Sequence, residues 1–240
     1  MDAYYYDLVN GSYQPRLDDL SKLTYNAGAD TYTLIDPQGD QLVFSGFGSG
    51  WLAAQKGQFQ GYTDANGVTM SVTSYTSDGH IAETQRSATT RGQTVTESWL
   101  YGYVASGVNA GLLAGVTLRT KVNSGAWTVV RQAQYAYYDG TQTYGGSAGD
   151  LLTATVLDGS NDVLDTSYYR YYVAGQSNGY QHGLEYVFSP DSYDRLTAAL
   201  GTNVSNLSYA QVAPYADNYF QLSPTRTAAP TRCTPTTSWR

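Results

Sequence analysis

The chain has 240 residues, a formal net charge of −7 and 14% charged residues, well below the roughly 25% of an average soluble domain. It contains 24 tyrosines and 25 glycines, which argues against a coiled coil or a long-helix bundle, because those need abundant Ala, Glu, Lys, Leu and Arg. The acidic balance argues against a nucleic-acid partner, and no run of about 18 apolar residues predicts a membrane span. The hydrophobic content of 41% is enough for a folded core.

The acidic residues are almost all aspartate, with 17 Asp against three Glu, namely Glu83, Glu97 and Glu185. Glutamate and lysine favour helix surfaces, so the scarcity of both indicates β structure. Aspartate is favoured in turns, where its carboxylate bonds to the backbone two residues further on. Many of these aspartates lie beside glycine, at points where an apolar–polar alternation stops. We therefore assign most carboxylates to turns rather than to catalysis or calcium binding.

Residues 1–29 form a lead-in to which we assign no element, and the β region is predicted over residues 30–222. Runs of β-branched and aromatic residues separated by turn sequences predict a series of hairpins. The first turn, residues 36–39, has aspartate first, proline second and glycine fourth, as type I turns prefer. The paired strands are expected at residues 31–35 with 41–47, 59–63 with 68–75, 116–122 with 127–138, and 151–157 with 163–173. This spacing predicts an all-β fold of antiparallel hairpins.

One segment departs from the β pattern. Ser189 as N-cap, Pro190 at the first helical position and Gly201 past the end are the start and stop signals of a helix. They predict a short helix over Pro190–Leu200, and a further helical turn is expected at residues 209–213. At helical spacing the buried face of the first helix would be Tyr193, Leu196, Ala199 and Leu200.

The composition changes again after residue 222. Residues 223–240 are rich in Thr, Pro, Ala, Ser and Arg, hold three of the seven prolines and show no periodicity. This composition predicts a disordered tail. The single cysteine, Cys233, lies in it and can form no internal disulfide.

Three segments resemble a known family. Residues 75–81, Tyr-Thr-Ser-Asp-Gly-His-Ile, resemble the Tyr-Asp repeat of bacterial Rhs/YD-repeat proteins, with His80 where arginine is usual. A second element is Tyr-Ala-Tyr-Tyr-Asp-Gly at residues 135–140, followed by Gly-Asp-Leu at residues 149–151. The third is the aromatic strand Ser-Tyr-Tyr-Arg-Tyr-Tyr at residues 167–172. The resemblance covers roughly residues 30–222, by motif character and not by a strict period.

The resemblance implies a fold and a role. Rhs/YD-repeat chains coil long β-ribbons into a hollow shell; some enclose a toxin domain and others act at the cell surface. It implies that this chain is a fragment of a large bacterial member and a non-enzymatic segment of its shell wall. The implied partners are the remaining repeats of the parent protein, and the implied location is extracellular or at the cell surface. Alternation in the third element places Tyr168, Arg170 and Tyr172 on one face of a strand.

A carbohydrate-binding module is the alternative that the residues leave open. Glu97 alternates with Trp99 and Tyr101, which would give a strip for stacking on sugars, and the aromatic strand offers Tyr169 and Tyr171 on a common face. The candidate ligand-binding residues for surface carbohydrate are therefore Trp99, Tyr101, Tyr169 and Tyr171. A glycoside-active enzyme ranks lowest, because hydrolysis needs two facing carboxylates about 5–10 Å apart and nothing marks such a pair among the three glutamates.

Other motifs have simpler explanations. Residues 36–39 resemble the start of the aspartyl protease element of self-cleaving family shells, but Asp40 stands where leucine is expected. Residues 158–162 echo a calcium loop, without its glycine and its final glutamate. His80 and His182 are the only histidines, too few for a three-histidine zinc site. We therefore expect no catalytic residue, no metal and no cofactor.

Overall fold

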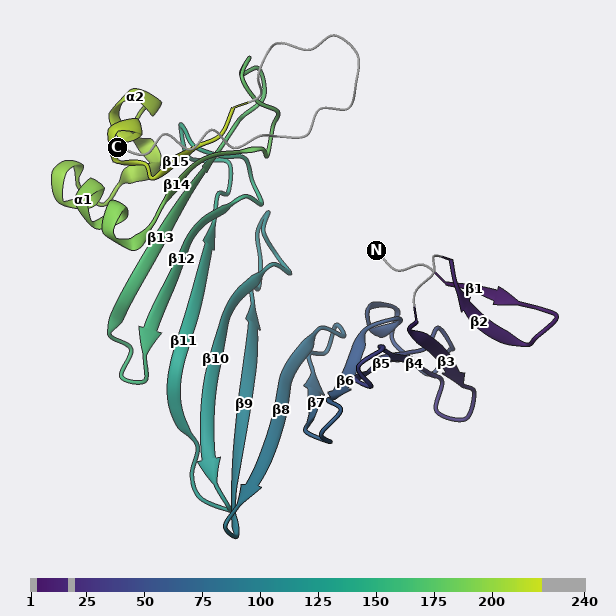
Figure 1. Ribbon diagram of the computed structural model, residues 1–240. Helices are drawn as coiled ribbons and strands as arrows, with labels where there is room; N and C mark the ends of the chain where they lie inside the picture. Colours follow the sequence, from purple (N-terminus) through teal and green to yellow (C-terminus); the bar gives the residue numbers. More distant parts are fainter. Residues whose placement is uncertain (1–3, 17–19, 222–240) are drawn as a thin grey trace. The chain divides into compact units, whose positions relative to one another are not determined.

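The structure, a computed structural model, describes residues 4–16 and 20–221 (Figure 1). Strands dominate the fold. They are β1 (Tyr4–Asp7), β2 (Ser12–Pro15), β3 (Lys22–Asn26), β4 (Thr31–Ile35), β5 (Gln41–Ser45), β6 (Phe59–Thr63), β7 (Thr69–Tyr75), β8 (Ile81–Thr90), β9 (Gln93–Tyr103), β10 (Leu113–Val122), β11 (Thr128–Tyr137), β12 (Leu151–Asp158), β13 (Val163–Tyr171), β14 (Leu184–Phe188) and β15 (Asn218–Tyr219). The helical elements are η1 (Ala53–Gln55), α1 (Pro190–Leu200), η2 (Val204–Asn206), α2 (Tyr209–Val212) and η3 (Ala213–Tyr215).

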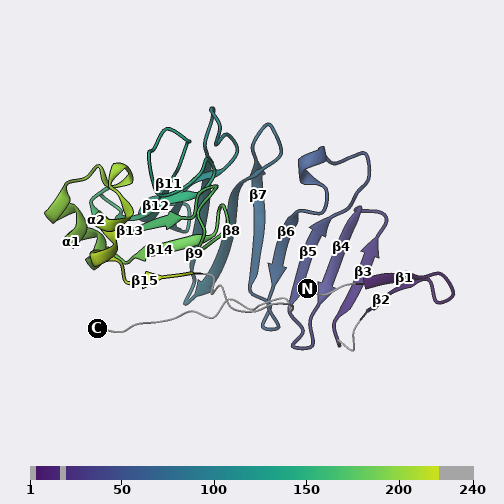
Figure 2. The same cartoon turned by 90° about the horizontal axis from the view of Figure 1, so that it is seen from above.

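Apart from β2 and β3, strands that follow one another in the chain pair with each other. β1 and β2 form a two-stranded sheet of their own, and the other strands follow one another in the order β15 to β3 without a crossover. The meander from β3 to β8 is seen in Figure 2. The pairs with a defined register are all antiparallel. The predicted all-β fold of antiparallel hairpins is therefore confirmed.

The four predicted hairpins are also confirmed, as β4–β5, β6–β7, β10–β11 and β12–β13. The strands differ from the prediction at their ends, since β5 stops at Ser45 and β13 at Tyr171. The lead-in, to which we assigned no element, contains β1, β2 and β3, and the β8–β9 hairpin was not predicted either. The predicted tail, residues 223–240, lies outside the described residues.

Three turns share one arrangement. The Oδ1 atom of Asp36 accepts hydrogen bonds from the amides two and four residues further on, both at 2.9 Å. Asp64 and Asp158 repeat this pattern at 2.8–3.0 Å. The fourth residue of each turn has positive φ, which favours glycine or asparagine; these residues are Gly39 (93°), Gly67 (84°) and Asn161 (71°). These three carboxylates therefore serve in turns, as predicted.

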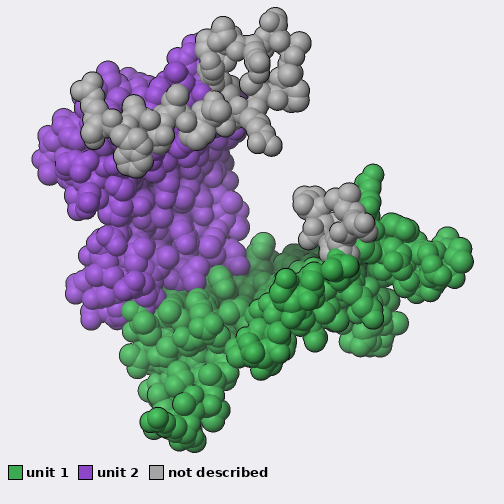
Figure 3. All heavy atoms as spheres, viewed as in Figure 1, with its two compact units in different colours: residues 1–101, 117–130 green, residues 102–116, 131–240 purple. Residues whose placement is uncertain are grey.

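The chain divides into two compact units (Figure 3). Unit 1 contains residues 1–101 and 117–130, and unit 2 contains residues 102–116 and 131–240.

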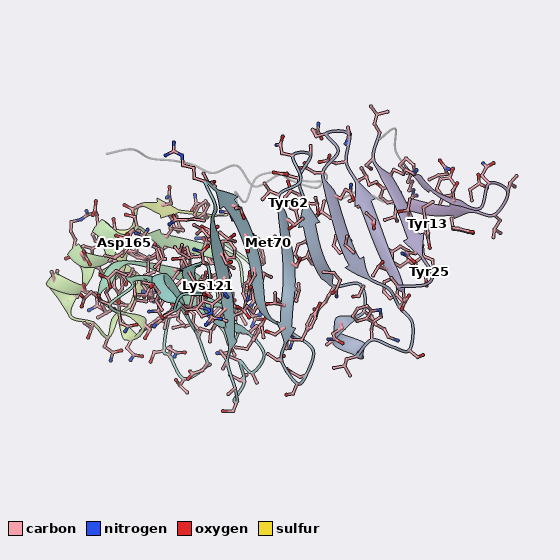
Figure 4. The ribbon with its side chains drawn as sticks, turned by 90° about the horizontal axis from the view of Figure 1, so that it is seen from below. Tyr13, Tyr25, Tyr62, Met70, Lys121 and Asp165 are labelled. Carbon is pink, nitrogen blue, oxygen red and sulfur yellow. The ribbon has the colours of Figure 1, made fainter. Side chains whose placement is uncertain are left out.

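Unit 1 is a single layer of sheet with two different faces. On one face, a row of apolar side chains crosses the sheet from β3 to β7. Its members stand directly opposite one another in successive strands: Leu23, Leu34, Leu42, Tyr62 and Met70. A second row on this face holds Tyr25, Tyr32, Phe44 and Phe59. We call this the apolar face; Tyr25, Tyr62 and Met70 are labelled in Figure 4.

The other face of unit 1, the polar face, carries mostly hydroxyl and amide side chains. One row across it from β3 to β9 is Thr24, Thr33, Val43, Gly61, Ser71, Gln85 and Ser98. The eight hydrophobic side chains that are buried in the described residues all belong to unit 2. Strand alternation has therefore sorted unit 1 into two faces without giving its described residues a buried hydrophobic core.

Unit 2 does have a core. It forms where α1 packs on β13 and β14 and where the segment after α1 folds back. Its buried cluster consists of Tyr138, Tyr168, Phe188, Leu196, Val204 and Val212. The face of β13 predicted to hold Tyr168, Arg170 and Tyr172 is the buried one, since all three side chains are at most 4% exposed. These tyrosines fill a core rather than a wet sheet surface.

Helix α1 has the predicted bounds but a different buried face. It starts with Pro190 at its first position and ends before Gly201, whose φ is 84°. Ser192 and Leu196 are buried and Tyr193 is half-buried, whereas Ala199 and Leu200 are exposed. The prediction that Ala199 and Leu200 are buried was wrong. It selected the buried face from apolar residues only, whereas the polar residue Ser192 is one of the two buried residues of the helix. The buried Ser192 hydroxyl donates a 2.5 Å hydrogen bond to Asp217, which satisfies it away from water. The predicted helical turn at residues 209–213 is confirmed as α2 with the start of η3.

Candidate binding surfaces

The first pair of predicted ligand-binding residues, Trp99 and Tyr101, lies on β9 in unit 1. Both point to the apolar face, because Trp99 stands opposite Thr84, and Thr84 is two residues from Arg86 in the row that contains Met70. The Arg86 guanidinium lies 5.4 Å from the centre of the Trp99 ring. The Tyr101 hydroxyl is 3.2 Å from that of Thr84. Both aromatic side chains are half-buried and engaged with β8.

Glu97 completes this group. It stands directly opposite Arg86 and forms a salt bridge with it. One flank of Trp99 therefore carries a charged pair that can donate and accept hydrogen bonds. A sugar stacking on Trp99 from the side of Arg86 would first have to displace that guanidinium.

The second predicted pair, Tyr169 and Tyr171, lies on β13 in unit 2. Tyr171 packs edge-on against Tyr138 with 6.3 Å between ring centres. Burial raises the pKa of Tyr171 to about 12. Tyr169 is half-buried opposite Val187, and its carbonyl accepts a 2.9 Å hydrogen bond from the Tyr138 hydroxyl. Tyr171 thus supports the core, which leaves Tyr169 alone as a stacking residue on this strand.

The two glutamates of unit 1 do not form a facing pair. Glu97 lies on the apolar face of unit 1, whereas Glu83 lies on the polar face, beside Ser98. Glu185 belongs to unit 2 and is 5% exposed. Burial raises the pKa of Glu185 to about 7, and the nearby Arg170 opposes that rise.

Glu83 is the centre of a hydrogen-bonded group on the polar face. Its Oε1 accepts from Arg119 Nη2 at 2.9 Å, from Ser98 at 2.5 Å and from Gln85 at 2.8 Å. Burial alone would raise the pKa of this carboxyl, but the hydrogen bonds, that of Ser98 foremost, hold it at about 2. Arg119 and Lys121 lie over the ring of Trp127, at 4.3 and 4.6 Å from its centre. The group ties β8, β9 and β10 together and leaves Glu83 no role as an acid at neutral pH.

Arg170 holds the C-terminal segment of unit 2. Its side chain is fully buried on β13, donates a 2.9 Å hydrogen bond to the carbonyl of Leu207, and lies 4.6 Å from the ring centre of Tyr209. The sequence indicated the face of Arg170 but not this role, because Leu207 and Tyr209 are more than 35 residues away in the chain.

His182 and Asp150 form a hydrogen-bonded pair that the sequence did not indicate. The His182 Nδ1 atom lies 2.8 Å from a carboxylate oxygen of Asp150, whose other oxygen accepts from the amide of Ser147 at 2.7 Å. His182 has a φ of 68°, in a region unusual for a residue other than glycine. The pair joins the β11–β12 loop to the β13–β14 loop.

A groove in unit 1 was also missed. It has a volume of about 710 Å³ and lies between the β1–β2 hairpin and β3. Tyr6 and Gly11–Pro15 line the side of the hairpin, and Ser21–Tyr25 line the other side. The sequence did contain a signal for the hairpin that forms one side of the groove, because the turn residues Asp7 and Gly11 lie between the segments that form β1 and β2. In the structure, the carbonyl of Asp7 accepts a 2.8 Å hydrogen bond from the amide of Gly11.

Residues 4–16 and 20–221 contain neither a candidate metal centre nor a helix that could cross a membrane. No group of three or more His, Cys, Asp or Glu side chains there is placed to hold a metal ion. Nor does this part of the chain contain a helix with the length and apolar character needed to cross a membrane. The Asp158 carboxylate, considered above for calcium, accepts backbone hydrogen bonds within its own turn.

The fold and these surfaces define an antiparallel all-β protein with one helical cap. Comparisons of the sequence with protein-family models and with curated proteins found no match.

Proposed function

We propose that this chain is a structural, non-enzymatic segment of a β-sheet wall, of the kind that Rhs/YD-repeat proteins build. The observation that carries the proposal is the two-faced single layer of unit 1. Apolar side chains form continuous rows on one side of the sheet and hydroxyl side chains form rows on the other. A globular enzyme domain would be expected to cover such an apolar face with a second layer of its own.

The wall role explains how unit 1 is held together. Its strands pair laterally, its turns fix the register through aspartate side chains, and aromatic residues pair across strands, as with Tyr25 and Tyr32 at 4.8 Å between ring centres. Cross-strand pairs of this kind stabilise a sheet by roughly 0.2–1 kcal/mol each. The charged groups serve the same purpose, since Glu97 binds an arginine of the neighbouring strand β8 and Glu83 on β8 binds an arginine of β10, across β9.

In this proposal the partners are further repeats of a larger parent protein. They would supply what packs on the apolar face, as neighbouring units do in repeat proteins. An extracellular or cell-surface location follows from the resemblance to the family and from nothing else in the molecule.

The proposal is tested by measuring how accessible the apolar face is. The purified chain should bind the dye 8-anilinonaphthalene-1-sulfonate, which reports exposed apolar surface. Leu42→Ser and Met70→Ser should each weaken dye binding severalfold, whereas Val43→Ser, a matched change on the polar face, should leave it nearly unchanged. Equal effects of all three variants, or reproducible turnover of any glycoside or peptide substrate by the pure chain, would contradict the proposal.

Carbohydrate binding is the second candidate function. Its support is the group on β8 and β9, where two aromatic rings, Trp99 and Tyr101, share a face with the Arg86–Glu97 pair. A glycan-binding screen tests it, with Trp99→Ala as the disabling variant and Trp127→Ala, a tryptophan near the polar-face group, as control. Absence of binding to every polysaccharide tried would remove this candidate.

A further inference from the structure

Three asparagines of the chain, Asn10, Asn66 and Asn178, are each followed by glycine. An asparagine in this setting can lose its side-chain amide without an enzyme. The backbone nitrogen of the glycine attacks the side-chain carbonyl carbon, a new C–N bond closes a succinimide ring, and ammonia leaves. Water then opens the ring to aspartate or isoaspartate, so the net reaction consumes water and releases ammonia. Glycine favours the step because it has no Cβ to hinder the backbone rotation that the ring requires.

The attack requires a glycine amide that is free to give up its proton, and in the folded chain two of these amides are held. Gly11 donates a 2.8 Å hydrogen bond to the carbonyl of Asp7, and Gly67 donates a 2.9 Å hydrogen bond to the carbonyl of Asp64. An amide that donates to a carbonyl keeps its proton and its direction. Each of these two turns therefore has to open locally before its asparagine can react.

The same two turns place a carboxylate against the asparagine. The Asp7 carboxylate accepts hydrogen bonds from the backbone and side-chain nitrogens of Asn10, at 3.3 and 2.5 Å. The Asp64 carboxylate accepts a 2.9 Å hydrogen bond from the amide of Asn66. A negative charge this close opposes the anion that forms when the glycine amide loses its proton. Both turns are thus protected by hydrogen bonding and by charge.

Asn178 lies in the loop between β13 and β14 and has neither protection. Among the described residues no hydrogen bond holds the Gly179 amide, and no carboxylate bonds to Asn178. The Asn178 side chain is exposed, and the Ser177 hydroxyl donates a 3.4 Å hydrogen bond to its carbonyl oxygen, which polarises the carbon under attack. We infer that Asn178 is the site of spontaneous deamidation in the folded chain and that the other two sites are shielded by their turns. This inference does not depend on the wall function.

The product alters the loop at a packed position. Gly179 lies against the ring of Tyr172, where a Cβ on residue 179 would come within 2.1 Å of a ring carbon. Isoaspartate lengthens the main chain directly before Gly179, and either product adds a negative charge. Tyr172 also accepts a 3.0 Å hydrogen bond from the amide of His182, the residue that pairs with Asp150. Modification of residue 178 is therefore expected to loosen this loop.

The test follows the full chain during incubation at mildly alkaline pH, with the rate at each asparagine measured by peptide mass spectrometry. The same rates are measured in guanidinium chloride, and the ratio of folded to unfolded rate removes the effect of neighbouring residues on intrinsic reactivity. This ratio should be about two- to tenfold larger at Asn178 than at Asn10 and Asn66. That range corresponds to the net free energy of one hydrogen bond that has to open.

Two variants check the cause. Asn178→Gln should remove the reaction from this loop, because glutamine would have to close a larger ring. Asp64→Ala, which takes the carboxylate from the second turn, should raise the rate at Asn66 and leave the rate at Asn178 unchanged. The inference is overturned by equal ratios at the three sites, by a smaller ratio at Asn178 than in either turn, or by an unchanged rate at Asn66 in the Asp64→Ala chain.

Discussion

The substitution Glu83→Gln is the sharpest test of how unit 1 is held together. It removes the charge from a carboxylate whose one oxygen, Oε1, accepts from Arg119, Ser98 and Gln85. The shape of the side chain is kept, so the test addresses charge rather than packing. Arg119 is left on the polar face without its counter-charge, although it keeps its contact with Trp127.

The magnitude follows from the pKa of the Glu83 carboxyl, which is lowered from 4.5 to about 2. At about 1.4 kcal/mol per pKa unit this sets an upper limit of roughly 3 kcal/mol on the contribution to stability. The side chains of Glu83 and Arg119 are 13% and 23% exposed, so solvent screens part of it. We expect a loss of about 1–3 kcal/mol at neutral pH.

The pH dependence has a definite sign. Because the folded-state pKa of Glu83 lies below its unfolded value, the stabilisation is complete above about pH 4.5 and is lost as the pH falls through about 2. The difference between the parent chain and Glu83→Gln should therefore shrink steadily over this window. Below it, the two proteins should unfold alike.

Urea unfolding followed by tryptophan fluorescence provides the assay. Trp51, Trp99 and Trp127 all belong to unit 1, and Trp127 touches the arginine of the pair. Glu97→Gln is the matched control, because its partner Arg86 is 48% exposed and such pairs contribute about 0–1 kcal/mol. The reasoning fails if both variants lose the same stability, or if the Glu83→Gln difference persists undiminished near pH 2.

Three further predictions concern unit 2 and one loop of unit 1. Leu196→Ala, at a fully buried site, should cost about 2–5 kcal/mol, measured by hydrogen exchange of α1 and β13 amides. Gly146→Ala should cost about 1–3 kcal/mol, because a Cβ there would lie 2.5 Å from the Tyr138 ring, whereas Gly50→Ala meets nothing within 4 Å and should be nearly neutral in thermal melts. Glu185 has its pKa raised from 4.5 to about 7, so unit 2 should lose up to roughly 3 kcal/mol as the pH rises through this range, and Glu185→Gln should abolish that loss in urea titrations at several pH values.

The parts of the fold that depend on neighbouring residues could be predicted from the sequence. The turn that starts at Asp36 forms because its carboxylate reaches amides two and four residues away, and Gly39 accepts the positive φ. Helix α1 begins at Pro190 and stops before Gly201 for equally local reasons. The β8–β9 hairpin escaped because its tight turn places Arg91 at φ 52°, a position where asparagine or aspartate would have been the signal.

The candidate surfaces could not be predicted, because they depend on register and on distant segments. Period-two alternation shows which residues of one strand share a face, but only the pairing of Leu42 with Tyr62 and of Tyr62 with Met70 makes an apolar row out of separate strands. Tyr171 was predicted to bind ligand because it shares a strand face with Tyr169, yet Tyr138, the residue after β11, packs against it. The contact of Tyr138 with Tyr171 joins positions more than 30 residues apart, which no local pattern encodes.

The connectivity gives the wall proposal its last support. Each strand of the meander pairs only with the strands before and after it in the chain, so every hairpin forms its hydrogen bonds without a distant segment. A sheet built this way can be lengthened or shortened by whole hairpins, because stability accumulates from units and their nearest neighbours. Enzymes that gather catalytic groups from distant strands do not tolerate such changes. The sheet from β3 to β15 therefore has the connectivity expected of a wall that grows by adding hairpins.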